Sequence, residues 1–214
     1  KNLITFSNNQ RFENHIIYTI NKDLDWSFKK HNLNNVVSEQ IFVYSGKWNY
    51  FYTCRELSKL LPDKKAVIIA HDSLELGMVS NLGLTNPVIF YVHGAYDYYY
   101  DLATKHSAWI DNYITVAQHI ADKLRTSLPE RKDSIHYVRF PIRDINFDGK
   151  KDLSLIQIVF AGRCTDVKGY SLLPDIEKEL QRRKVILKWH IAGEGSTNPQ
   201  NQNIWPTNSN VIFH

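Results

Sequence analysis

Short apolar runs alternate with longer amphipathic segments along most of the chain. The runs are typical of strands buried in a parallel sheet, and the segments repeat apolar residues every three or four positions, as helices do. The predicted strands are residues 3–6, 40–44, 66–70, 88–92, 113–116 and 135–140. The predicted helices are residues 12–30, 50–61, 98–110 and 118–128, with a short helix that Ser73 caps. This alternation predicts βαβ units and a parallel sheet covered on both faces.

The alternation of predicted strands and helices is interrupted once, at residues 143–152, and then resumes. Residues 143–152 are highly charged and contain a glycine and paired lysines, so we expect a linker at 146–153. Strands are predicted at 158–160, 185–191 and 211–213, and a helix at 171–183. The apolar face of that helix comprises Leu172, Leu173, Ile176 and Leu180. The prediction is two Rossmann-like α/β domains, 1–145 and an incomplete one at 154–214.

Composition narrows the functional classes. The chain has 214 residues, 43% of them hydrophobic, and a net charge of +4. This charge suits an anionic substrate or an acidic membrane surface but is too small to indicate nucleic acid.

Cys54 and Cys164 show no metal-ligand spacing and fit a reducing compartment. No apolar run approaches the roughly 18 residues of a membrane span. No signal peptide is visible, although the chain begins at Lys1 and trimming stays open, so we expect a cytoplasmic protein.

Ligands of parallel α/β sheets bind at the carboxyl ends of the strands, so residues after each predicted strand are the candidates. In the first domain these positions hold Ser7, Asn8, Asn9, His71, Asp72, His93, Gly94 and Ala117. His93 follows a buried strand and precedes a glycine, which permits close approach of a ligand. A histidine that bonds a neighbouring carbonyl is an equal alternative. For His71 and Asp72 a structural role is favoured, because Asp is a common helix cap.

In the second domain the candidate is the loop between a strand and a helix that holds Arg163 and Lys168. Arginine offers phosphate a planar fork, lysine offers a point charge, and a helix start adds N–H donors. The sequence therefore predicts an anion site, with a solvated basic turn as the alternative.

Several motifs are absent or weak. Lys168 precedes Gly169 rather than Ser or Thr, so the loop is not a Walker motif. The turn Gly193-Glu194-Gly195 lacks the third glycine of a dinucleotide fingerprint. Asp23-Leu24-Asp25 resembles a metal-diphosphate triplet but is predicted on the solvated face of a helix. The run Tyr98-Tyr99-Tyr100 can stack a ring ligand or cap a sheet edge. We expect no metal and no cofactor.

The stretch FAGRCTDVKGYSLLPDIEKEL at 160–180 resembles the start of the second domain of retaining GT-B glycosyltransferases of family 4, the group 1 transferases. HIAGEG at 190–195 and VIFH at 211–214 resemble the strands that follow it. VIFYVHG at 88–94 and DNYITVAQHIADKL at 111–124 resemble segments of the first domain. The resemblance covers roughly the last 130 residues, and its GR…KG part is the most specific.

The resemblance implies roles for individual residues. Arg163 and Lys168 would be catalytic, holding the donor diphosphate and its leaving charge within the loop that Gly162 and Gly169 bound. His93 would be catalytic across the cleft, facing the sugar or the reaction centre. The turn of Gly193 and Glu194 would line the nucleotide side. The acceptor side would include Ser7, Asn8, Asn9, His71 and Asp72.

The chain departs from the family in three ways. Residues 7–10 contain no glycine, where the family's first loop is usually glycine-rich, and Ala117 stands where serine is usual. The family's paired glutamates lie beyond the last strand of this chain. We therefore expect a fragment of a longer enzyme, or one part of a split one, with little transferase activity by itself.

The resulting expectation is a metal-independent enzyme of polysaccharide biosynthesis that transfers a hexose-type sugar from a nucleotide diphosphate to a glycan or lipid-linked acceptor, with retention. The alternatives are a sugar-nucleotide epimerase or hydrolase, and a non-catalytic sugar-nucleotide-binding domain. Basic residues at Lys123, Arg125, Arg131 and Lys132 indicate either peripheral contact with the inner face of the membrane or scattered surface charge. The donor base, the sugar, the acceptor and the oligomeric state stay open.

Overall fold

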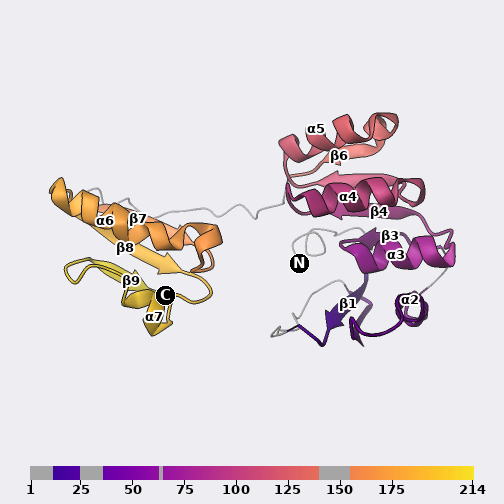
Figure 1. Ribbon diagram of the computed structural model, residues 1–214, viewed down its shortest axis with the longest axis horizontal. Coiled ribbons are helices and arrows are strands. Elements are labelled where there is room, and N and C mark those ends of the chain that lie inside the picture. The colour runs from indigo at the N-terminus through magenta and orange to yellow at the C-terminus, as the bar shows by residue number, and fades with distance from the viewer. Residues whose placement is uncertain (1–11, 25–35, 63–64, 140–154) are drawn as a thin grey trace. The chain divides into compact units, whose positions relative to one another are not determined.

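The computed structural model describes residues 12–24, 36–62, 65–139 and 155–214 (Figure 1). The chain divides into two compact units, Lys1–Asp144 and Ile145–His214, and each is described here by itself. The predicted strand at 3–6 and the predicted linker at 146–153 lie outside the described residues. Every strand pair in the described residues is parallel, so the predicted α/β class with parallel sheets is confirmed.

The main sheet of the first unit has the strand order β3-β4-β5-β6. Its strands are β3 (Ile68–Ala70), β4 (Val88–Val92), β5 (Asn112–Thr115) and β6 (Ile135–Tyr137). The connecting helices are α3 (Ser73–Leu82), α4 (Asp97–Lys105) and α5 (Gln118–Ser127), with 3-10 turns η1 (Ser107–Trp109) and η2 (Pro129–Ser134). Strands and helices were predicted here within a few residues of these bounds, because their apolar periods are unambiguous.

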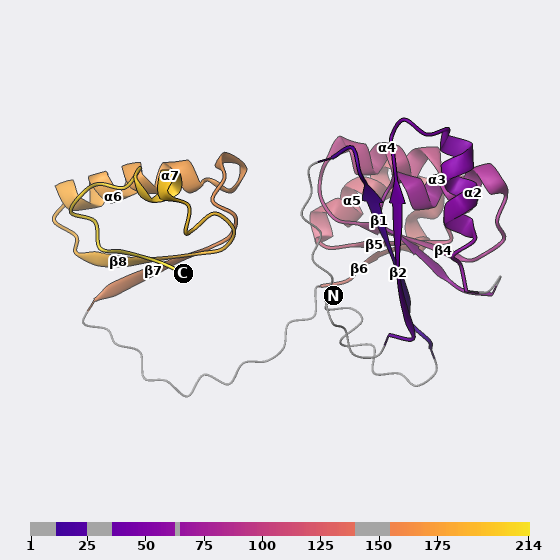
Figure 2. The ribbon, with the colours of Figure 1, turned by 90° about the horizontal axis from the view of Figure 1, so that it is seen from below.

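Helices cover one face of this sheet. Figure 2 shows α3, α4 and α5 on the same side of β4, β5 and β6. The side chains that point to the helices, among them Val88, Phe90 and Tyr113, are fully buried. On the opposite face Ile69 is 49% exposed. Among the described residues the sheet therefore carries helices on one face, whereas the sequence predicted helices on both.

A two-stranded parallel sheet joins β1 (His15–Asn21) and β2 (Ser38–Tyr44), and α2 (Tyr50–Ser58) follows it. Phe42 of β2 and Ile17 of β1 pack into the same hydrophobic core as the main sheet. The strand predicted at 40–44 and the helix predicted at 50–61 are confirmed.

The helix predicted at 12–30 is wrong, because residues 15–21 form β1. The spacing of Ile16 and Ile20 suits a helix, but the segment HIIYTIN is rich in β-branched and aromatic side chains, which favour a strand. Seven residues of β1 pair in register with β2, from His15 opposite Ser38 to Asn21 opposite Tyr44. Residues 15–21 form a strand because they pair with β2, which the local sequence pattern cannot reveal.

The second unit is a three-stranded parallel sheet in the order β7-β8-β9. Its elements are β7 (Ile156–Ala161), 3-10 turns η3 (Asp166–Lys168) and η4 (Tyr170–Leu172), α6 (Leu173–Arg182), β8 (Leu187–Ala192), α7 (Pro199–Gln202) and β9 (Val211–Phe213). Figure 2 shows α6 and α7 on one side of this sheet. Trp189 and Ile191 of β8 are buried on that side with Tyr170. The strands and the helix predicted for this part of the chain are confirmed.

The prediction that β7 is buried on both faces is wrong. Val159, in the middle of the strand, is 66% exposed, while Ile158 and Phe160 pack against the core. In the described part of the second unit helices lie on one side of the sheet only, so alternate residues of β7 face outward. An apolar run by itself does not tell which of its faces is covered.

Candidate functional site

The candidate residues of the first unit meet at the carboxyl ends of β3 and β4. His71 follows Ala70 and His93 follows Val92, and the two strands pair side by side with Ala70 opposite Phe90. The side chains touch, with His71 Nδ1 2.8 Å from His93 Nε2. The structure therefore brings together two residues that the sequence placed after separate strands.

Tyrosine rings support this histidine pair. The ring of Tyr91, which is buried in β4, lies 4.8 Å from the ring of His93 and 5.5 Å from that of His71. Tyr99 of α4 lies 6.1 Å from His93 on another side. The pKa of His71 is lowered to about 4, first by burial and then by His93, although part of its surface stays exposed. Burial also lowers the pKa of His93. Both imidazoles are therefore neutral at pH 7.

Asp72 has a structural role. It is the N-cap of α3 and forms a capping box, in which its side chain accepts from Ser73 N and its own N–H donates to Glu75. Asp72, rather than Ser73, thus caps the helix. Its carboxylate also accepts a hydrogen bond from the hydroxyl of Tyr98. Thr19 of β1 donates to Glu75, whose pKa burial raises.

The other strand-end candidates of the first unit are Ser7, Asn8, Asn9 and Ala117. Ser7, Asn8 and Asn9 lie outside the described residues. Ala117 is the N-cap of α5 and offers no side-chain cap.

Asp23, predicted on a solvated helix, follows β1 instead. Its carboxylate accepts from Ser45 Oγ at 2.6 Å and from Gly46 N at 2.8 Å, which ties β1 to β2. Its contacts are structural.

The cation loop, residues 162–169, follows β7 in the second unit. Arg163 and Lys168 are both exposed, and within the described residues neither side chain forms an ion pair or hydrogen bond. Lys168 ends the 3-10 turn η3, and Gly169 then adopts a left-handed conformation with φ 73°. Among the described residues the two cations are accessible both to an anion and to solvent, so the anion site stays a prediction.

The backbone of the cation loop is held by the turn after β8. Gly162 N donates to Ala192 O and Cys164 N donates to Glu194 O, each at 2.9 Å. Gly193 has φ 138°, and a Cβ at this position would lie 2.2 Å from Gly162 O. Glycine is therefore required at 193 so that the two backbones can touch. Glu194 itself is exposed, and its carbonyl, rather than its side chain, makes this contact.

Tyr170 anchors the other end of the loop, a role that the sequence analysis missed. It is buried, and its hydroxyl donates to Asn201 O at 2.7 Å and accepts from Trp205 Nε1 at 2.9 Å. The available signal was a tyrosine directly after Gly169 at the start of a helix. Tyr91 was missed as well, although it stands two residues before His93 and so points to the same side of β4.

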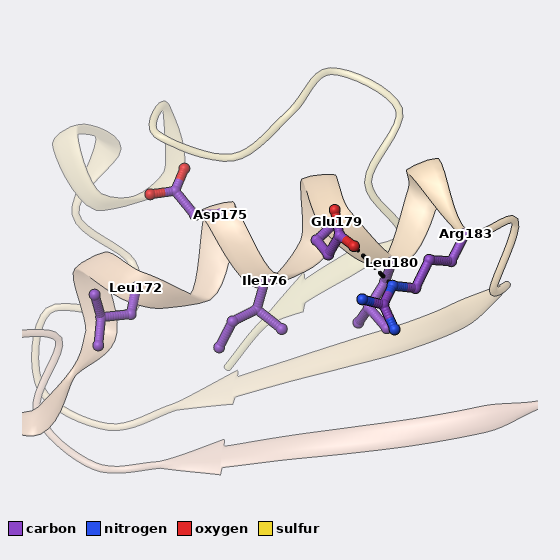
Figure 3. Close-up of a pocket in the computed structure, with 6 residues that line it drawn as sticks. All are labelled: Leu172, Asp175, Ile176, Glu179, Leu180 and Arg183. Atoms are coloured by element: carbon purple, nitrogen blue, oxygen red, sulfur yellow. Dashed lines mark hydrogen bonds and ion pairs between the residues drawn. The ribbon is translucent and has the colours of Figure 1, made fainter.

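An apolar groove runs along α6 (Figure 3). It has a volume of about 540 Å³ and is lined by Leu172, Asp175, Ile176, Glu179, Leu180 and Arg183. The predicted apolar face of this helix is therefore only partly buried. Leu173 and Leu180 pack against the core, whereas Leu172 is 62% exposed. The candidate cations do not line the groove.

Three of the four predicted basic residues of the first unit have partners within the protein. Lys123 pairs with Asp97, Arg125 with Asp122, and Arg131 donates to the carbonyls of Ile110 and Asp111. Lys132 is exposed. These contacts favour structural roles for most of this charge.

The described residues hold no cluster of three or more His, Cys, Asp or Glu side chains that could bind a metal ion. None of the helices in this part of the chain is long and apolar enough to cross a membrane. Burial raises the pKa of Cys164, which keeps this thiol protonated.

Comparison with known proteins leaves the family open. No protein family model matches the chain, and no curated protein matches it.

Proposed function

We propose that the chain carries part of a retaining glycosyltransferase of the GT-B type, in which the cation loop of the second unit binds the diphosphate of a nucleotide-sugar donor. The observation that carries this proposal is the state of Arg163 and Lys168. Both are exposed and unpaired among the described residues, on a loop whose backbone is fastened at both ends. Lys123 and Arg125 of the first unit, by contrast, pair with Asp97 and Asp122.

The chemistry of sugar transfer suits such a loop. When the bond between the sugar and the diphosphate breaks, negative charge grows on a phosphate oxygen. Arg163 can meet two oxygens with its planar fork, and Lys168 can add a point charge. Donors held in place before the reaction stabilise the developing charge without reorganisation, and each can contribute a few kcal/mol in the transition state. This assignment uses no metal ion.

The second proposed part is the acceptor side, which we assign to His93. A hydroxyl of the acceptor must be oriented for attack on the sugar, and a neutral imidazole can donate to it or accept from it. Burial lowers the pKa of His93, so the neutral form is the one that meets the hydroxyl at pH 7. The acceptor class, a glycan or a lipid-linked sugar, follows from the resemblance alone.

Calorimetric titration with nucleoside diphosphates tests the donor site. UDP, GDP, ADP and dTDP, with the matching monophosphates, would be titrated into the 214-residue protein and its variants. We expect one diphosphate to bind at least tenfold more tightly than its monophosphate. Arg163→Ala and Lys168→Ala should each weaken that binding by about tenfold, because each removes a charge-assisted contact. The matched control is Lys132→Ala, which removes an exposed lysine of the first unit and should leave the affinity unchanged.

Two results would overturn the donor site: absence of binding by all four diphosphates, or binding that neither variant weakens. Product analysis with the sugar conjugate of the best diphosphate separates the reaction classes. Sugar attached to an acceptor supports transfer. A freed or altered sugar with no acceptor attached would favour an epimerase or hydrolase instead, and binding without turnover would favour a binding domain.

A further inference from the structure

The geometry of the His71–His93 pair restricts where its protons lie. The ring centroids are 5.0 Å apart while the bonded nitrogens, His71 Nδ1 and His93 Nε2, are 2.8 Å apart. The planes differ by 27°. The rings therefore meet nitrogen to nitrogen, close to in line, rather than face to face.

A hydrogen bond between two imidazoles needs one N–H and one bare nitrogen. In a neutral pair this leaves His71 Nε2 and His93 Nδ1 with opposite roles. If His71 donates, His93 Nδ1 carries the remaining proton of its ring and acts as a donor. If His93 donates, its Nδ1 is bare and acts as an acceptor. The state of His71 thus decides what His93 offers to a ligand.

The surroundings keep the pair neutral and its outward nitrogens open. Tyr91 lies against both rings and Tyr99 against His93, which shields part of each histidine from water, although both residues keep exposed surface. Burial lowers the pKa of both histidines, whereas the negative charge of the nearby Asp72 raises it. Its carboxylate is already engaged by the helix start and by Tyr98. Within the described residues neither His71 Nε2 nor His93 Nδ1 has a hydrogen-bond partner.

We propose that His71 is a positioning residue, which fixes the tautomer and orientation of His93 and thereby sets whether His93 Nδ1 donates to or accepts from a ligand hydroxyl. A hydroxyl is the matching group because it donates and accepts at once. Naming that hydroxyl as the acceptor of a sugar rests on the proposed function. The coupling between the two imidazoles does not.

The test is NMR spectroscopy of protein labelled with ¹⁵N in its histidines, since nitrogen shifts report which ring nitrogen carries the proton. Comparison with His71→Ala and His93→Ala assigns the two rings. We expect each ring of the wild-type protein to hold a single tautomer at pH 7, with one protonated and one bare nitrogen. In His71→Ala we expect His93 to lose this preference, and its pKa should rise toward the ordinary value as the covering ring is removed.

Two amide variants sharpen the test. Asn places an amide near the position of Nδ1, which is the nitrogen that His71 uses, whereas Gln places it near Nε2. His71→Asn should therefore restore a single tautomer of His93, and His71→Gln should not. The control is His190→Asn, which alters a similar histidine contact, His190 Nδ1 to His214 Nε2 at 3.0 Å, in the second unit. It should leave the signals of His71 and His93 unchanged.

The proposal is overturned if both rings show averaged tautomers in the wild-type protein, or if His71→Ala leaves the tautomer of His93 unchanged. None of these measurements needs a ligand. Failure of the diphosphate titration would remove the proposed function and leave the imidazole pair standing.

Discussion

The histidine pair of the first unit and the cation loop of the second differ in how their polar side chains are held. In the first unit His71, His93 and Asp72 are hydrogen-bonded to one another or to their neighbours, and the ring of Tyr91 lies beside both histidines. In the second unit Arg163 and Lys168 stand in solvent, and the protein orders only the backbone beneath them. The first arrangement suits a group that must present one defined nitrogen. The second suits a ligand whose own charge brings it to the site.

This difference predicts where each region is vulnerable. The cation loop depends on a close backbone contact and on Tyr170, so its structural weak points lie beside the cations rather than at them. The histidine pair is held by a hydrogen bond between its own side chains, so we expect it to be disturbed by protonation. Three measurements separate these dependences.

Replacing Gly193 by alanine should have the largest effect. The new Cβ would meet Gly162 O at 2.2 Å, and φ of 138° is strained for any residue with a side chain. We expect the second unit to lose about 3 kcal/mol or more, which is enough to unfold a small unit. Urea unfolding followed by the indole N–H signals of Trp189 and Trp205 reports the second unit, and the signal of Trp109 reports the first. Only the former should shift.

The control for this change is Gly169→Ala in the same unit. Gly169 also has a positive φ, 73°, but the nearest atom to its added Cβ is Leu172 Cδ1 at 3.9 Å. We expect a cost of only about 1 kcal/mol, from the backbone conformation alone. Equal costs at the two glycines would contradict the requirement for close approach at Gly193.

Tyr170→Phe should have an intermediate effect. It removes a hydroxyl that donates to Asn201 O and accepts from Trp205 Nε1. We expect the second unit to lose about 1–2 kcal/mol, because two partly buried partners are left unpaired. Tyr96→Phe, at a tyrosine that is 66% exposed in the first unit, should change stability by less than about 0.5 kcal/mol. If the two substitutions cost the same, the hydroxyl of Tyr170 is not an anchor.

Protonation of His71 should have the smallest effect on stability. The folded-state pKa is about 4, below the ordinary value of 6.5, so the unfolded chain binds more protons between these two values. The contribution to stability is complete above pH 6.5 and is lost as pH falls toward 4. Because the ring is partly exposed, we expect a loss of only about 1 kcal/mol.

His71→Asn removes this titrating group, so its unfolding free energy should fall less between pH 6.5 and 4.5 than that of the wild-type protein. Urea unfolding at several pH values, followed through Trp109, measures the difference. Parallel pH curves for the two proteins would show that the ring is not desolvated.

Most strands of the described residues were predicted correctly from the sequence. His71, His93 and Arg163 each follow a strand within a residue or two of the predicted position. The sequence misplaced residues 15–21, because the isoleucines there suit both periods, and it placed Asp23 on a helix for the same reason. It also left open whether His71 and His93 meet, since neighbouring strands reveal their register only when they pair.

What the sequence by itself determined is the order of the main strands and helices from β2 onward and the residue types at the strand ends. Both depend on local periodicity and on side-chain chemistry. The tertiary structure alone decided that β1 is a strand, that Gly193 must lack a side chain, that β7 exposes Val159, and that two histidines share a hydrogen bond. Each of these depends on atoms that are distant in the chain and are brought within contact only when the sheets form.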